Sequence, residues 1–158
     1  MKNINMVLEK VRELLSALMR PTVSVRLDEG AFLPVRAHDT DAGADVRTPC
    51  AFTVPAHGSA TIATGVHVQT PPYCATMIKS KSGLNIHYDI TTEGVVDEGF
   101  TGEIIVKLYN HGDHPKRFER GDKITQLVII PVLYPTYAQA ETIDGGDRGD
   151  AGYGSTGR

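Results

Sequence analysis

The chain has 158 residues, 41% of them hydrophobic, and a formal net charge of −3, which fits one soluble domain with short additions at its ends. The slightly negative charge excludes the basic surface that proteins use on nucleic-acid duplexes, so we expect no direct nucleic-acid binding. No apolar run approaches membrane-spanning length, and the N-terminus lacks the form of a secretory signal. The two cysteines, Cys50 and Cys74, are isolated, as is typical of thiols in a reducing compartment. We therefore expect a cytoplasmic protein that contacts no membrane.

Residues 1–20 predict an amphipathic helix. Between Asn5 and Met19 the apolar side chains recur at the spacing of one helical face: Leu8, Val11, Leu15 and Leu18, with Leu14 and Met19 alongside. Pro21 ends the pattern, because proline cannot continue a helix. An isolated helix of this length is marginal in water, so we expect its apolar face to dock on the chain's own domain. Self-association of the helices and a site for a partner protein are the alternatives.

Residues 21–140 change to short β-rich runs, in which Thr, Val and Ile dominate and Gly, Pro, Asp and His separate one run from the next. The runs are Thr22–Leu27, Ala51–Val54, Thr61–Gln69, Ala75–Lys79, Glu103–Tyr109 and Ile124–Val132. No convincing helix is predicted after the N-terminal one. Many short strands separated by turns indicate an all-β domain of the sandwich, jelly-roll or barrel type.

Residues 141–158 predict a flexible C-terminal arm. From Gly145 to Arg158 the segment is rich in glycine and has no aliphatic residue larger than alanine, so it cannot bury enough surface to offset its ordering entropy. Its polar and aromatic groups nevertheless suit a nucleoside triphosphate. They are Arg148 for phosphate, Tyr153 for stacking on a base, and the hydroxyl groups of Ser155 and Thr156. A plain disordered tail is the alternative.

Two segments of the β region offer groups for binding and proton transfer. Lys79-Ser80-Lys81-Ser82-Gly83-Leu84 follows a β-rich run and combines two cations, a hydroxyl and a glycine, which suits a phosphate cradle. Gly94–Gly102 predicts two strands bent around a tight turn, with Asp97 beside the apolar pair Val95-Val96. A carboxylate in that place can hold and deprotonate a water molecule. Ordinary surface turns are the alternative for both segments.

Two further segments offer polar groups at the ends of predicted strands. Gln126 follows the Gly121-Asp122 turn and can bind phosphate or water. Asp45 follows a turn that contains Gly43, and its carboxylate can reach a hydrated cation. Alone, each also has a simple structural explanation, as a solvent-facing strand residue or a turn-capping acid.

Taken together and in order, the five segments resemble the five motifs of the trimeric dUTPase family. Asp41–Val46 is similar to AGxDL, Lys81–Leu84 to RSGL, Gly94–Gly102 to GVIDxxYxG, Gly121–Leu127 to GDRIAQL, and Arg148–Gly157 to RGxGGFGSTG. The resemblance runs from about Thr22 to Arg158 and leaves out the N-terminal helix. It implies a jelly-roll-like β-clip subunit, and a homotrimer whose active sites lie between subunits and are completed by the arm of another copy.

The implied activity is hydrolysis of dUTP to dUMP and pyrophosphate with Mg²⁺, which limits uracil in DNA and supplies dUMP for thymidylate synthesis. By this resemblance Asp97 would activate the water that attacks the α-phosphorus. The segment Gly94, Val95 and Val96 would recognise uracil through its backbone, and Phe100 would pack under the deoxyribose. Magnesium would be held mainly by the three phosphates, with Asp45 acting through water.

The remaining implied roles concern the phosphates and the arm. Lys81, Ser82 and Gly83 would hold the α- and β-phosphates, and Gln126 would bind the phosphate and water network. The arm would contribute Arg148, Ser155 and Thr156 to the γ-phosphate and Tyr153, next to Gly154, to the uracil ring.

Three positions depart from the family pattern: Lys81 replaces arginine, Phe100 replaces tyrosine, and Tyr153 replaces phenylalanine. Lysine keeps the positive charge but loses the planar fork of arginine, and both aromatic exchanges keep a ring. The segment from Leu84 to Gly94 is short, so we assign no uracil-binding side chain within it. The alternatives are a dCTP deaminase or a bifunctional deaminase–dUTPase, against which Lys81-Ser-Gly-Leu and the full arm argue, and a regulatory protein on the same scaffold.

Overall fold

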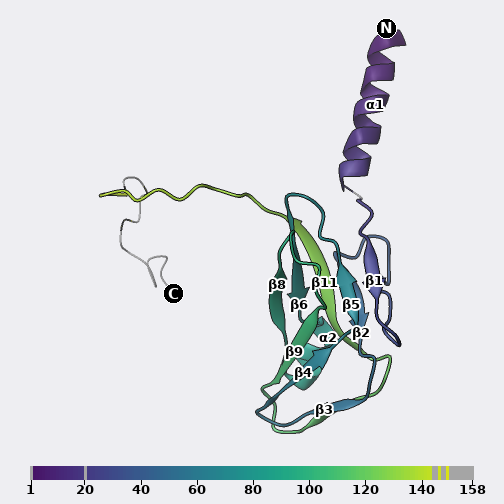
Figure 1. Cartoon of the computed structure of the whole chain (residues 1–158), viewed down its shortest axis with the longest axis vertical. Coiled ribbons are helices and arrows are strands. Elements are labelled where there is room, and N and C mark those ends of the chain that lie inside the picture. The colour runs from purple at the N-terminus through teal and green to yellow at the C-terminus, as the bar shows by residue number, and fades with distance from the viewer. Residues whose placement is uncertain (1, 20, 144–145, 147–148, 150–158) are drawn as a thin grey trace.

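The computed structural model describes residues 2–19, 21–143, 146 and 149, and shows a β-rich body from which a helix and an extended C-terminal segment both leave at one end (Figure 1). The helices are α1 (Lys2–Met19) and α2 (Ser82–Tyr88). The strands are β1 (Val25–Leu27), β2 (Gly43–Arg47), β3 (Phe52–Val54), β4 (Ser59–Ala63), β5 (Val66–Val68), β6 (Cys74–Lys79), β7 (Ile90–Thr91), β8 (Glu93–Val96), β9 (Ile105–Asn110), β10 (Lys116–Phe118) and β11 (Lys123–Pro131). The all-β prediction is confirmed for the body.

Two antiparallel sheets form the centre of the body. One has the order β2-β11-β6-β8 and the other the order β4-β9-β7, and the pairs β1-β5 and β10-β3 form two further sheets of two strands each. Along β9 exposed and buried residues alternate, so that Val106 and Leu108 face the core. They join a single apolar cluster with residues of the other sheet, including Val46, Ile78 and Leu127. This core fixes the strands whose ends carry the predicted site residues.

The predicted run Thr61–Gln69 is two strands rather than one, because Gly65 interrupts it. Gly65 has a φ of +67°, and a Cβ there would lie 2.7 Å from the Cβ of Ala31. Only glycine meets both conditions without strain. The chain therefore turns at this residue, and β4 and β5 join different sheets.

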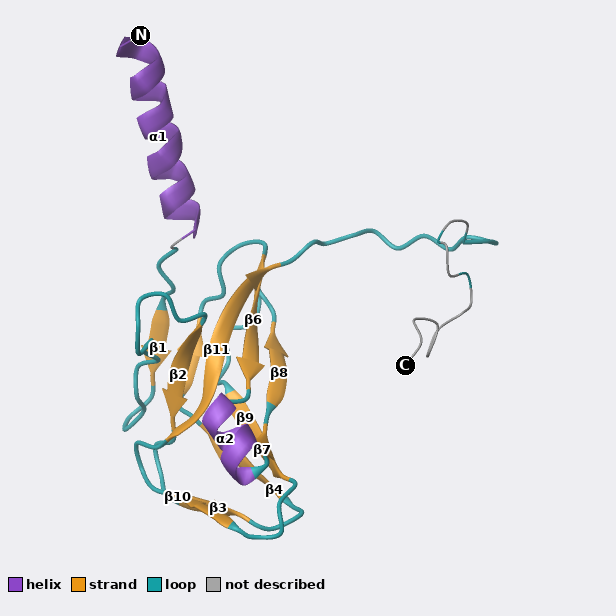
Figure 2. Ribbon diagram, turned by 180° about the vertical axis from the view of Figure 1, so that it is seen from behind, coloured by secondary structure: helices purple, strands orange, loops and turns teal. Residues whose placement is uncertain are grey.

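The expectation of no helix after the N-terminus is wrong, because α2 occupies Ser82–Tyr88 between β6 and β7 (Figure 2). None of its residues is fully buried, so it has no apolar stripe for sequence periodicity to detect. It ends at Asp89, which has a left-handed backbone and donates its N–H to the carbonyl oxygens of Asn85 and Leu84. The segment from Leu84 to Gly94, read from the sequence as a short loop, therefore contains most of a helix and β7.

The helix α1 forms as predicted but does not dock on the β body. It projects away from it (Figure 1), and the side chains of Ile4, Met6, Val7, Leu8 and Val11 keep between 45% and 65% of their surface exposed. Neither α1 nor α2 is long and apolar enough to cross a membrane, within the part of the chain that the structure describes.

After β11 the chain leaves the sheet as an extended segment (Figure 1). Leu133, Tyr137 and Ile143 on this segment are at least 90% exposed. Most of the predicted arm, with Arg148, Tyr153, Gly154, Ser155 and Thr156, lies outside the described residues.

Candidate active site

Three charged side chains meet where β2, β6 and β11 lie side by side. Asp45 is opposite Gln126 in the β2–β11 pairing, and Gln126 is opposite Lys79 in the β11–β6 pairing. The Asp45 carboxylate accepts a hydrogen bond from the ammonium of Lys123 at 2.6 Å and another from the ammonium of Lys81. Burial alone would raise the pKa of Asp45, but the hydrogen bonds from Lys123 and Lys81 outweigh it and hold the pKa below its ordinary value. We call Asp45, Lys81 and Lys123 the charge cluster.

The charge cluster opens into a cavity of about 420 Å³. The cavity is lined by Ala37, His38, Asp41, Ala42, Gly43, Asp45, Lys81, Lys123 and Gln126. The first, second and fourth family-like segments therefore come together within one chain. A second cavity, of about 350 Å³, lies at His57, Tyr109 and His111 and contains none of the predicted site residues.

Gly43 and Gln126 are fitted to each other at the wall of this cavity. A Cβ on Gly43 would lie 2.2 Å from the Oε1 atom of Gln126, so glycine leaves the space in which the amide lies. Gln126 donates its Nε2–H to the carbonyl oxygen of Ser80 at 3.0 Å. The amide is thereby held next to the segment that carries Lys81.

The Lys81–Gly83 segment is the N-terminus of α2. Backbone N–H groups in the first turn of a helix have no partner within the helix and favour anions. No side chain caps this end, since Lys81 at the N-cap makes no capping hydrogen bond. A Cβ on Gly83 would meet nothing within 4 Å, so packing does not require glycine there. Close approach of a bound ligand to the backbone would require it.

Asp97 is exposed in the turn that follows β8. The backbone N–H of Phe100 donates to the carbonyl oxygen of Asp97 at 3.1 Å and closes the turn. The prediction of two strands over Gly94–Gly102 is wrong in its second half, because β8 pairs with β6 and the chain after the turn is irregular up to β9. Of the apolar pair before the turn, Val96 is buried, whereas Val95 is 59% exposed.

Within one chain Asp97 does not meet the charge cluster. Val96 lies opposite Thr76 at one end of β6, whereas Lys81 follows the other end of that strand. By the same register Asp97 is level with Ala75, and the six residue steps from Ala75 to Lys81 span about 20 Å of extended chain. The sequence segments alone could not show this separation, because it depends on the pairing register.

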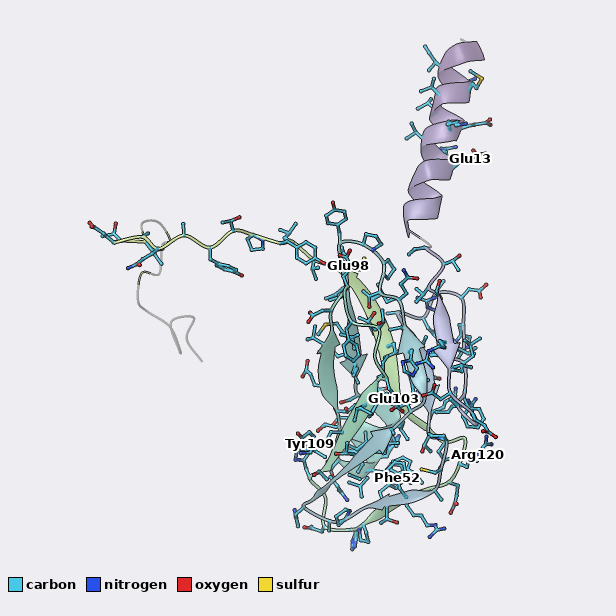
Figure 3. The ribbon with its side chains drawn as sticks, viewed as in Figure 1. Glu13, Phe52, Glu98, Glu103, Tyr109 and Arg120 are labelled. Atoms are coloured by element: carbon cyan, nitrogen blue, oxygen red, sulfur yellow. The ribbon has the colours of Figure 1, made fainter. Side chains whose placement is uncertain are left out.

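Glu98, the neighbour of Asp97, connects this turn to Tyr134 at the start of the C-terminal segment. The Glu98 carboxylate accepts hydrogen bonds from the Tyr134 hydroxyl at 2.7 Å and from the backbone N–H of Tyr73 at 2.9 Å. The Tyr134 bond lowers the pKa of Glu98 and raises the pKa of Tyr134 to about 12. Figure 3 shows Glu98 at the end of the body from which the C-terminal segment leaves.

Phe100, a predicted sugar contact, lies over a glycine. A Cβ on Gly102 would be 2.5 Å from the Cζ atom of Phe100, so the ring occupies the space that a side chain would fill. The next residue, Thr101, is held by its carbonyl oxygen, to which Nδ1 of His67 donates at 3.1 Å. The Phe100 ring therefore lies over Gly102, next to a fixed stretch of backbone, and remains 46% exposed.

Sequence reasoning missed Lys123 and Glu98. The signal for Lys123 was a cation at the position where the fourth family motif carries arginine. Glu98 offered no signal beyond its charge, because its partners Tyr73 and Tyr134 are distant in the sequence.

The described residues do not form a metal cage of their own. No group of three or more His, Cys, Asp or Glu side chains within residues 2–19, 21–143, 146 and 149 is arranged to hold an ion. Both carboxylate oxygens of Asp45 accept hydrogen bonds from lysines. This donor set fits an ion that reaches the site on a phosphate ligand and meets Asp45 through water, since Mg²⁺ keeps several waters and shares few carboxylates.

Comparison with known sequences gives one family over most of the chain. A family model described as dUTPase matches residues 30–157. The deoxyuridine 5'-triphosphate nucleotidohydrolase of Clostridium acetobutylicum is 37% identical over 135 residues, which cover 84% of this chain and 93% of that protein.

Solved structures give the same result. The Staphylococcus bacteriophage 80alpha dUTPase, determined with dUPNHPP, superposes with a TM-score of 0.82 at 26% identity and covers 88% of this chain and 100% of its own. A mutant dUTPase from phage phi11 of S. aureus, described for its coordination of a structural Mg(II) ion, has a TM-score of 0.71 at 27% identity. The match to it covers 77% of this chain and 97% of that one.

Proposed function

The chain belongs to the dUTPase family and hydrolyses dUTP to dUMP and pyrophosphate, and on this premise we propose how its own residues divide the reaction. The observation that carries the proposal is the separation of Asp97 from the charge cluster along β6. Phosphate binding is assigned to one end of the sheet and water activation to the other.

At the phosphate end, Lys81, Ser82 and Gly83 hold the α- and β-phosphates. The cavity beside them, the uncapped N-terminus of α2 and the open space over Gly83 support this role. Lysine has three N–H donors, so Lys81 can keep its hydrogen bond to Asp45 and still donate to a phosphate oxygen. We extend the same role to Lys123, the second ammonium of the charge cluster.

Gln126 completes the phosphate end. Its Nε2–H is already donated to Ser80, which leaves the Oε1 atom and the second N–H for phosphate-bound water. Because Gly43 leaves space for it, the amide needs no rearrangement when the substrate enters.

At the other end, Asp97 is the general base that deprotonates the water attacking the α-phosphorus. The base and the phosphate-binding groups must both lie within a few ångströms of that phosphorus. In one chain they are about 20 Å apart along β6, so a complete site takes Asp97 from one copy and the charge cluster from another. This requirement supports a homotrimer with active sites shared between subunits.

Recognition of the nucleoside is assigned to β8 and the turn after it. β8 is the edge strand of its sheet, so part of the backbone of Gly94, Val95 and Val96 faces away from β6 and can pair with uracil. Phe100 keeps 46% of its surface exposed, so its ring can offer an apolar surface to the deoxyribose. In this proposal the ring also excludes a ribose 2′-hydroxyl.

The arm of a further copy closes the site in this proposal. Arg148, Ser155 and Thr156 bind the γ-phosphate, and Tyr153, beside Gly154, stacks on uracil. The extended segment that precedes the arm supports this, because its exposed Leu133, Tyr137 and Ile143 would gain cover on a neighbouring copy.

Magnesium is the proposed cofactor, with the phosphates as its main ligands and Asp45 acting through water. When bound, the ion neutralises charge on the triphosphate and so favours attack on the α-phosphorus. Pyrophosphate release from dUTP, dCTP, dTTP and UTP, measured with magnesium and with a chelator, tests the substrate and the cofactor together. Release from dUTP that persists in chelator would contradict the metal assignment.

A mixing experiment tests the shared site. Chains with Asp97→Asn and chains with Lys81→Ala are each expected to be nearly inactive. Random reassembly of the two at equal amounts gives about a quarter of the sites an intact Asp97 from one copy and an intact Lys81 from another. About a quarter of wild-type activity is therefore expected. If mixed assemblies, verified with two different affinity tags, recover no activity, the site is not shared.

A further inference from the structure

The helix α1 carries an apolar face that the dUTPase match does not include, since that match begins at residue 30. Ile4, Val7, Leu8 and Val11 lie on it, and at least 45% of each side chain is exposed. A helix of 18 residues is marginal in water without a partner. The β body does not cover this face (Figure 1), so another surface must do so.

The spacing of the apolar residues indicates what that surface is. Ile4, Leu8, Val11, Leu15 and Leu18 follow one another at alternating intervals of four and three residues. This is the heptad repeat of a coiled coil, with Leu8 and Leu15 at a and the other three at d. All five are aliphatic, and the charged residues Lys2, Glu9, Lys10, Arg12 and Glu13 occupy other heptad positions. Such a seam is complementary to an identical seam.

We propose that α1 forms a parallel three-stranded coiled coil with the α1 helices of two other copies of this chain. Leucine at a with the β-branched residues Ile4 and Val11 at d disfavours two strands and favours three or four. Apolar residues also occupy the g positions, Val7 and Leu14, so the face is wider than a two-stranded seam needs. The number of strands matches the homotrimer, and the inference rests on the proposed function in that respect.

The position of α1 on the body agrees with this assembly. The helix α1 leaves the β body at the same end as the C-terminal segment (Figure 1). Glu98, next to Asp97, lies at this end too (Figure 3). That end supplies the groups assigned to a neighbouring copy's site, so it faces other copies in the homotrimer. A helix rooted there is close to the same helix of its neighbours.

Disulfide trapping in the full-length chain tests the coiled coil. The starting variant replaces both free cysteines, Cys50→Ser and Cys74→Ser, and Leu8→Cys then places one thiol at an a position. Under mild oxidation the Leu8→Cys chain is expected to form disulfide-linked pairs on a denaturing gel. The matched control Lys10→Cys, at a c position on the same helical turn, is expected to remain monomeric on that gel.

The dilution behaviour of the assembly gives a second readout. Leu8→Glu with Val11→Glu is expected to raise the concentration at which the trimer dissociates by at least tenfold, while each assembled site keeps its activity. Asn3→Glu with Ser16→Glu adds the same charge at c and b positions and is expected to leave dissociation unchanged.

The outcomes separate this inference from the proposed function. An active trimer in which Leu8→Cys gives no more linked pairs than Lys10→Cys would overturn the coiled coil alone, and would mean that another partner covers α1. The coiled coil would also be overturned if the trimers of the two double glutamate variants dissociated at the same concentration. A wild-type chain that is active as a monomer would overturn the shared site as well.

Discussion

The two ends of strand β6 differ in how completely a single chain builds them. At the Lys81 end, Asp45 is 9% exposed and already paired with two lysines, and Gln126 is held against Gly43 and Ser80. At the other end Asp97 is exposed, and it makes no ion pair with the described residues. In the proposed function, the chain therefore preorganises phosphate binding by itself, and assembly brings the base to it.

The largest expected effect comes from replacing Asp97, the proposed general base, at the exposed end. Asp97→Asn keeps the size of the side chain but cannot accept a proton, so turnover is expected to fall at least about a hundredfold. Affinity for a non-hydrolysable dUTP analogue should remain within a few-fold, because the phosphate end is built from other residues. Single-turnover kinetics and calorimetric titration measure the two quantities. Near-wild-type turnover would remove Asp97 from the mechanism.

Alanine substitutions at two glycines of the phosphate end distinguish a glycine required by packing from a glycine required by a bound ligand. Gly43→Ala brings a Cβ to 2.2 Å from Oε1 of Gln126, so it should displace the amide, cost about 1–3 kcal/mol of stability and lower activity. Gly83→Ala meets nothing within 4 Å and should not destabilise the chain, because alanine favours the helix. Its activity should still fall roughly tenfold or more, since a ligand must approach that backbone.

Thermal unfolding and dUTP turnover of both variants check this pair. Gly99→Ala is the control, because its Cβ also meets nothing within 4 Å and the substitution is expected to change neither stability nor activity. If Gly83→Ala keeps full activity, the N-terminus of α2 does not bind phosphate closely.

The charge cluster predicts a loss of stability at acid pH. The pKa of Asp45 is lowered in the folded chain, so its stabilising contribution is complete above the ordinary value of 3.8 and is lost as the pH falls through the lowered pKa. Asp45→Asn leaves Lys81 and Lys123 without their carboxylate and should cost about 1–2 kcal/mol at neutral pH, because both ammonium groups remain partly solvated.

The measurement is thermal unfolding of wild type and Asp45→Asn from pH 7 to pH 3. The difference between the two should shrink toward the acid end, as wild-type Asp45 also becomes protonated. A difference that does not change with pH would mean that Asp45 acts by packing and not by charge.

Sequence reasoning reached the all-β body, and it named Asp45, Lys81 and Gln126, which line one cavity, because these features depend on local pattern and on order along the chain. It could not place Asp97 relative to Lys81, since that distance is set by the β6–β8 register. It missed α2 because a short helix without a fully buried residue has no apolar period. The partners of Glu98 were equally hidden, because a hydrogen bond between residues distant in sequence leaves no mark on either segment.

The smallest expected effect concerns His67, which hydrogen-bonds to Thr101 in the loop that follows Asp97. Nε2 of His67 faces the Asp28 carboxylate at 3.0 Å and Nδ1 faces the Thr101 carbonyl oxygen at 3.1 Å, so both ring nitrogens can donate when the ring is protonated. The hydrogen bond to Asp28 raises the pKa of His67, although the nearby Arg26 opposes the rise. The stabilisation is therefore complete below the ordinary value of 6.5 and is lost as the pH rises through the raised pKa.

His67→Gln keeps a neutral donor and acceptor but cannot become charged. Its deficit in melting temperature relative to wild type should be largest near pH 6 and should decline toward pH 9. His57→Gln, which removes an exposed pair with Asp113, is the control and should show little effect at any pH. If the His67 deficit instead stays constant, the ring supports Thr101 in its neutral form. The loop that carries Phe100 would then be held equally well across the whole pH range.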